Sequence, residues 1–153
     1  MRAAALLLVG ASLAAGACGR SAPPPAPVPA ALNTGPSLYT RLGGTDAIRT
    51  VVGDFLARVA ADGRINAFFR GVDLDSLQLK LTDQICQASG GPCRYAGRSM
   101  HAAHADMRIT DAEFDALIED LAAALDHAGV GPEEERELLT ALNGLRKQIV
   151  TVR

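Results

Sequence analysis

The sequence predicts an all-α domain, and three observations support this prediction. Apolar residues recur at intervals of three and four along several stretches, residues that favour helix starts precede those stretches, and no stretch requires a strand. The 153 residues are of a length expected for one domain. Their formal charge of −2, without a basic stripe, argues against nucleic acid as a partner.

Residues 1–17 are typical of a secretory signal peptide, because Met1-Arg2 precedes an almost wholly apolar or small-residue run that is short for a membrane span. The run leads into Ala15-Gly16-Ala17-Cys18, which resembles a bacterial lipoprotein processing site with a lipidated Cys18, although Leu is usual where Ala15 stands. We expect export to the periplasmic face of a bacterial membrane, with membrane contact only through this N-terminal anchor. Ordinary signal cleavage nearby, which would release the protein into the periplasm, is the alternative.

Residues 18–36 form a predicted linker, which holds most of the chain's eight prolines and has no periodic apolar face. Proline biases such a segment toward an extended polyproline conformation, so we expect a tether. The folded domain is then residues 37–153, which is long enough for a single core.

The first long helix of that domain is expected to begin after the Gly43-Gly44 turn, with Thr45 as its N-cap. Its apolar residues follow at helical spacing: Ile48, Val51, Val52, Phe55, Leu56 and Val59. Gly63 interrupts the pattern, and Ile65 to Phe69 are expected to add one further turn. Asp73 is the predicted cap of the next helix, whose apolar face is Leu74, Leu77, Leu81 and Ile85. Residues 77–81 alternate as a strand would, but the longer window favours a helix.

Two more helices are predicted in the C-terminal third. Thr110 and Glu113 form a capping box, with Ile109 and Phe114 placed as its hydrophobic staple. The buried stripe of this helix is Phe114, Leu117, Ile118, Leu121 and Leu125, and Gly129 ends it. Pro132 suits a first helical position, and the last helix is expected to carry Leu138, Leu142, Leu145 and Ile149 on one face.

The stretch from Gly90 to His104 carries the candidate chemistry. Gly90-Gly-Pro92 breaks the preceding helix, a loop carries Tyr95 and Gly97, and a short helical turn then presents Met100 and His104 on one face. A neutral imidazole there can bind a metal or a haem iron. A core or surface histidine without a ligand has the same local pattern.

The order and spacing of several motifs resemble group I truncated haemoglobins over the whole domain. The motifs are Leu38-Tyr39-x-x-Leu42-Gly43-Gly44, Phe55-x-x-Arg58-Val59, Phe68-Phe69-x-Gly71, Gly90-Gly91-Pro92-x-x-Tyr95-x-Gly97-x-x-Met100, His104, and Ile109-Thr110-x-x-x-Phe114. This resemblance implies a truncated (2-over-2) globin fold, in which two crossed helix pairs clamp haem b and its iron.

The resemblance also implies residue roles. His104 matches the axial iron ligand, whereas His101, its rival three residues earlier, is expected to be exposed. The expected cofactor-binding residues are Phe69, Leu77, Lys80, Leu81, Tyr95, Met100, His104, Ile109 and Phe114. Lys80 is expected either to pair with a haem propionate or to close onto the iron as a sixth ligand, which would require its neutral amine.

The expected distal pocket departs from the family, because its residues, Phe55, Leu56, Leu77 and Leu81, offer no hydrogen-bond donor. Family members usually have Tyr at the position of Leu56 and often Gln on the distal helix. One lost hydrogen bond to a charged group is worth roughly 1.5–3 kcal/mol, or about ten- to a hundredfold in oxygen affinity. We therefore expect a globin that binds oxygen, nitric oxide or carbon monoxide. A haem redox enzyme, such as a nitric oxide dioxygenase or weak peroxidase served by a reductase, is the alternative.

Three states remain open for Cys86 and Cys93. In an exported protein they are expected to form a disulfide, which would tie the distal helix to the loop leading toward His104. With His101 and His104 they could instead bind zinc, in a haemless structural lipoprotein. Two unpaired thiols are the third possibility.

Overall fold

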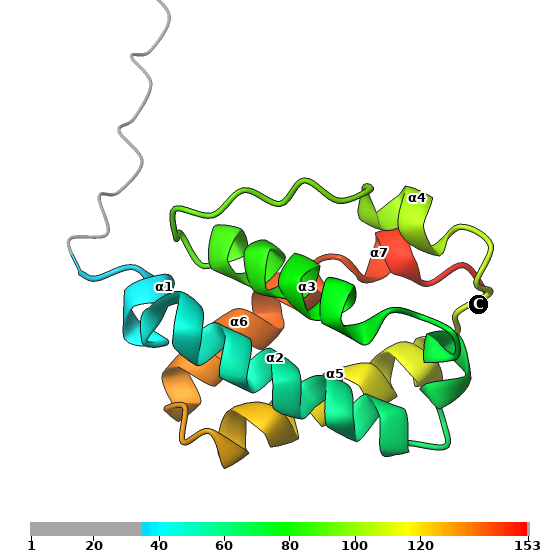
Figure 1. The fold of residues 1–153 in the computed structure, drawn as a ribbon, viewed down its shortest axis with the longest axis horizontal. Coiled ribbons are helices and arrows are strands. Elements are labelled where there is room, and N and C mark those ends of the chain that lie inside the picture. Colours follow the sequence, from blue (N-terminus) through cyan, green and yellow to red (C-terminus); the bar gives the residue numbers. More distant parts are fainter. Residues whose placement is uncertain (1–34, 153) are drawn as a thin grey trace, which may run out of the picture. The chain divides into compact units, whose positions relative to one another are not determined.

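The structure, a computed structural model, describes residues 35–152. The predicted signal peptide, Cys18 and most of the predicted linker lie outside the described residues. Within residues 35–152 every regular element is a helix, which confirms the predicted all-α class (Figure 1). None of these helices combines the length and apolarity that crossing a membrane demands.

Eight helical segments follow one another along the described chain, and all but the 3₁₀ turn η1 are α-helices. They are α1 (Leu38–Arg41), α2 (Gly44–Ala61), η1 (Asn66–Phe69), α3 (Leu74–Ala88), α4 (Met100–His104), α5 (Asp111–His127), α6 (Pro132–Asn143) and α7 (Arg146–Ile149).

The four long helices form two packed pairs, α2 with α3 and α5 with α6, and α2 also packs against α5 (Figure 1). The short helix α4 packs against α7, and in Figure 1 it lies on the side of α3 away from α2. Apolar side chains of α2, α3, α5 and α6 fill the main core, because each helix turns one stripe inward. The least exposed of them are Val52, Val59, Cys86, Ala116, Ala124, Leu125 and Leu138.

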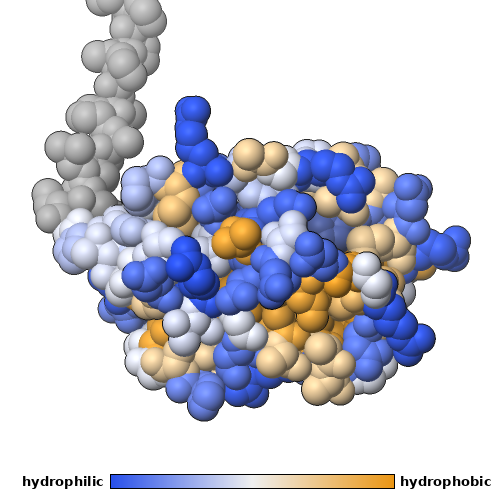
Figure 2. Space-filling model, viewed as in Figure 1, coloured by the Kyte–Doolittle hydropathy of each residue, from blue (hydrophilic) through white to orange (hydrophobic). Residues whose placement is uncertain are grey.

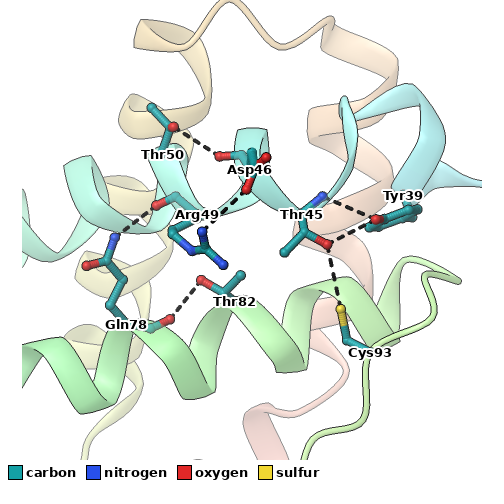
Figure 3. A network of polar contacts seen from close by, with 8 residues as sticks. All are labelled: Tyr39, Thr45, Asp46, Arg49, Thr50, Gln78, Thr82 and Cys93. Carbon is teal, nitrogen blue, oxygen red and sulfur yellow. Dashed lines mark hydrogen bonds and ion pairs between the residues drawn. The ribbon is translucent and has the colours of Figure 1, made fainter.

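The start of α2 differs from the prediction, since Gly43, not Thr45, is its N-cap. Gly43 has φ +91°, a left-handed conformation that glycine adopts without strain. The Thr45 hydroxyl instead lies 3.0 Å from the Tyr39 hydroxyl and 3.8 Å from Cys93 Sγ (Figure 3). Thr45 therefore joins α1, α2 and the loop after α3, which no local pattern indicates.

The predicted caps of α3 and α5 are confirmed. The Asp73 carboxylate accepts a hydrogen bond from the Ser76 backbone N–H, and Thr110 and Glu113 form the complete capping box. Leu74 differs from its predicted place on the apolar face of α3, because its side chain lies at the surface. The predicted one-turn element after Gly63 is the 3₁₀ helix η1.

The single C-terminal helix that we predicted is two helices, α6 and α7, separated at Gly144 and Leu145. Glycine lowers helix propensity there, and contacts with α5 hold α7 in a new direction. The Arg146 guanidinium lies 4.4 Å from the Phe114 ring centroid and 3.0 Å from Asp111. The break therefore turns α7 back onto the start of α5.

Candidate functional site

A cavity of about 390 Å³ lies among α3, α4, α5 and α7. This volume is in the range of sites for small ligands and cofactors. Figure 2 shows apolar side chains gathered in the right-hand half of one face, with hydrophilic side chains at their border. All nine residues expected from the sequence to bind a cofactor line this one cavity: Phe69, Leu77, Lys80, Leu81, Tyr95, Met100, His104, Ile109 and Phe114.

His104, the last residue of α4, presents its imidazole to the cavity in a fixed orientation. Its Nδ1 lies 2.7 Å from the backbone carbonyl oxygen of Met100, one turn earlier. A carbonyl oxygen only accepts, so Nδ1 carries a proton, and in the neutral imidazole Nε2 then has the free lone pair. A second hydrogen bond of this kind is what orients metal-binding histidines in proteins. His101 is exposed and does not line the cavity.

The wall opposite α4 comes from α2 and α3 and is mostly apolar. Phe55, Leu77, Leu81 and Ile85 face the cavity there. Leu56, which we expected in the distal pocket, is buried in the main core instead and is absent from the cavity lining. The wall is therefore apolar as expected, but without a contribution from Leu56.

Gln84 is a polar residue of the cavity wall that was not among the residues expected from the sequence. It follows Leu81 on α3, and its Nε2 lies 3.2 Å from Met100 Sδ on α4. Its position one turn after Lys80 and Leu81, on the cavity side of α3, is the signal that could have identified it.

Charged groups also line the cavity. Lys80 and Arg98 bring side-chain cations to it, and the Lys80 side chain is exposed. The Glu113 carboxylate also lies at the lining, where the backbone N–H and then the hydroxyl of Thr110 lower the pKa of Glu113. The Tyr95 hydroxyl donates to the Arg98 carbonyl oxygen at 2.8 Å, which closes the loop beside the cavity.

Cys86 and Cys93 form a disulfide in the structure, with 5.7 Å between their Cα atoms. The bond joins α3 to the loop that leads to α4. Because both sulfurs are bonded to each other, neither thiolate that the zinc alternative requires is available.

The cavity fits the haem that the resemblance implies. Its walls are largely apolar, as the porphyrin requires, and one correctly oriented imidazole faces the interior. Lys80 and Arg98 are cations of the kind that pair with propionate carboxylates.

Comparisons with known proteins identify one family, the globins, over nearly all of the described residues. The sequence profile of the bacterial-like globins matches residues 37–151. A group 1 truncated haemoglobin of Tetrahymena pyriformis is 34% identical over 119 residues, which cover 78% of this chain and 98% of the relative. One from Mycolicibacterium paratuberculosis is 37% identical, over 75% of this chain and 85% of the relative.

Solved structures agree with the sequence comparison. The Fe(III) form of the Tetrahymena pyriformis truncated haemoglobin superposes with a TM-score of 0.73 at 35% identity, over 75% of this chain and 98% of that chain. A 2/2 haemoglobin from Synechococcus, in the cyanomet state and with covalently attached haem, gives a TM-score of 0.72 at 35% identity, with the same coverage.

Proposed function

Since this chain belongs to the bacterial-like globin family, we propose that it holds a haem iron through His104. The chain is a haem-binding globin, and its ligands are diatomic gases. When bound, the haem iron supplies the site at which oxygen, nitric oxide or carbon monoxide binds. What the protein would add is the His104 imidazole that holds the iron, the apolar walls of the slot and the cations at its edge.

The observation that supports His104 best is the hydrogen bond from its Nδ1 to the Met100 carbonyl oxygen. This bond fixes the tautomer and directs Nε2 away from the helix. An imidazole held in this way loses less rotational freedom on binding a metal than a free side chain would. His101, exposed and outside the lining, has neither feature.

The gas preference follows from the opposite wall. Phe55, Leu77 and Leu81 offer no hydrogen-bond donor, and Gln84 turns its amide toward α4, where one of its two N–H groups donates to the Met100 sulfur. Oxygen gains more from a donor than carbon monoxide does, because bound oxygen carries partial negative charge. We therefore propose that oxygen is held about ten- to a hundredfold less tightly than in a pocket with one donor.

The decisive experiment compares His104→Ala with His101→Ala. We expect His104→Ala to lose the haem, or the five-coordinate ferrous spectrum and its carbon monoxide adduct, whereas His101→Ala keeps both. Loss with His101→Ala alone would reverse the assignment. Far-UV circular dichroism of both apoproteins is the control for folding.

We also propose that residues 1–36 export the domain and anchor it to a bacterial membrane through a lipidated Cys18. The support is the sequence alone: an apolar signal-like run, a Cys at the processing site and a proline-rich segment before the globin domain. Wild-type protein should incorporate labelled palmitate and sediment with membranes, and Cys18→Ala should do neither. A reductase that keeps the iron ferrous would then have to act on the same side of the membrane.

A further inference from the structure

The segment that carries His104 is attached to α3 by one helical turn, residues 84–87. The Gly91 backbone N–H donates to the Cys86 carbonyl oxygen at 2.8 Å, and the disulfide joins Cys86 to Cys93. The Tyr95 backbone N–H donates to Gln87 Oε1 at 2.9 Å. Three successive links therefore connect this turn to the loop before α4.

The near end of this attachment is tightly packed. Cys86 is completely buried. A Cβ atom at Gly91 would lie 2.5 Å from Tyr39 Cδ2 and 2.6 Å from Cys86 Sγ, so the loop lies directly against the disulfide and α1. This packing leaves the start of the loop little freedom to move.

A fourth link reaches α4 itself. Gln84 Nε2 donates to Met100 Sδ at 3.2 Å, and the Met100 carbonyl oxygen accepts from His104 Nδ1 at 2.7 Å. Met100 is thus held at its sulfur by α3 and at its carbonyl by the imidazole. The path from Gln84 to the His104 ring consists of one residue and two hydrogen bonds.

We propose that Gln84 and the Cys86–Cys93 disulfide are positioning residues for His104. Helix α3 would then form one wall of the cavity and also fix the orientation of the imidazole on the opposite wall. The inference rests on the proposed function, in which His104 is the axial ligand. Gln84 acts through Met100, and the disulfide acts through the loop. Helix α4 has only one turn and needs such external support, because short helices are not stable by themselves.

The first test removes the Gln84 donor and reads the iron–histidine bond. Gln84→Leu keeps an aliphatic side chain as far as Cδ but has no N–H. In the ferrous, unliganded holoprotein, resonance Raman should show a shifted or broadened iron–histidine stretching band. Transfer of haem to excess apomyoglobin should be about threefold faster, as expected for one weak hydrogen bond.

Gln78→Leu is the matched control. Gln78 is also a glutamine of α3 that donates through Nε2, but its acceptor is the Arg49 carbonyl oxygen of α2, at 3.1 Å (Figure 3). Gln78→Leu should lower the melting temperature as much as Gln84→Leu does, without moving the Raman band. A band at the wild-type frequency in Gln84→Leu would overturn the role of Gln84.

A double-mutant cycle shows whether Gln84 acts through Met100. Met100→Leu should shift the band in the same way, and Gln84→Leu/Met100→Leu should shift it no further. Additive shifts would contradict the path through the thioether. Should Gln84→Leu fail to fold, Gln84→Glu offers a variant of nearly the same shape, also without a donor.

The disulfide is tested with Cys86→Ser/Cys93→Ser, and with wild-type protein reduced by a phosphine. Both should release haem at least tenfold faster than the oxidised protein, with a broadened Raman band. An unchanged rate and band in both would refute the role of the disulfide. If His104→Ala keeps the wild-type band, the ligand assignment of the proposed function fails instead, so the two failures are distinguishable.

Discussion

The helical body, α2 with α3 and α5 with α6, and the proximal segment, residues 91–107, are held in place by different means. In the body, side chains such as Val59, Ala124 and Leu125 are 0–1% exposed. Within residues 91–107, all of which the structure describes, no side chain is fully buried. The proximal segment has only partial apolar packing, of Met100 and Met107 against a small cluster around Phe114, and adds to it a disulfide, capping bonds and side-chain hydrogen bonds to α3.

Because of this difference, we expect the body to determine mainly the stability of the protein and the proximal segment mainly its haem binding. Burial of apolar surface stabilises the body and requires no particular chemistry at any one position. As the proposed haem ligand, the His104 imidazole must point into the cavity, and directional hydrogen bonds can fix its orientation, whereas apolar burial cannot. Substitutions in the body should therefore change stability first, whereas those in the proximal segment should change haem binding first.

The largest effect on stability is expected from Leu125→Ala in the body. Leu125 is 1% exposed, and its truncation leaves a cavity, so the free energy of unfolding should fall by about 2–5 kcal/mol. Chemical denaturation of the apoprotein measures this. The control is Leu79→Ala, where a leucine 59% exposed should cost less than about 0.5 kcal/mol. Similar losses for the two variants would show that the core assignment is wrong.

Gly91→Ala tests the junction between the two regions. The new methyl group would lie 2.8 Å from the Cys86 carbonyl oxygen, a backbone atom, as well as against the Tyr39 ring. We expect a loss of about 1–3 kcal/mol in stability, together with faster haem release. Gly63→Ala, at a position with no heavy atom within 4 Å, should change neither. A loss of stability without faster haem release would contradict the proposed link between α3 and the proximal segment.

Thr110→Ala should have a smaller effect, which depends on pH. The variant loses the N-cap hydroxyl of α5, at a cost of about 1 kcal/mol near neutral pH. The Thr110 backbone N–H and then its hydroxyl lower the pKa of Glu113, and the variant loses only the hydroxyl. The share of stability that the hydroxyl gives to the ionised carboxylate is present above the unfolded pKa of about 4.3. That contribution is lost as the pH falls through the lower folded pKa. The stability difference between wild type and variant should therefore narrow below pH 4, and a constant difference would contradict the coupling.

The smallest effect is expected from Lys80→Ala, at the edge of the cavity. Lys80 is exposed, and as a partner for a propionate it should contribute up to about 1 kcal/mol. We expect haem transfer no more than about fivefold faster and an unchanged high-spin ferric spectrum up to pH 9. A low-spin ferric form that grows with pH, and that Lys80→Ala abolishes, would establish Lys80 as a sixth ligand instead.

Much of the fold could be predicted from short-range patterns. The apolar periodicity that predicts α2, α3 and α5 spans only a few turns, and Asp73 and Thr110 cap their helices through residues three positions away. The shared face of Met100 and His104 follows from helix geometry alone. These features depend on neighbours in the chain, so the sequence by itself determines them.

The tertiary structure decided the rest, because periodicity shows which residues turn inward but not whether they meet a core or a cavity. Leu56 and Leu81 are both apolar positions of amphipathic helices, yet Leu56 packs in the core and Leu81 lines the cavity. Gln84 faces Met100 only because α4 folds back over α3. The chain breaks between α6 and α7 at Gly144 because Arg146 forms an ion pair with Asp111 and lies over the Phe114 ring. Each of these outcomes depends on a partner far along the chain, and only the packing of whole helices determines where that partner lies.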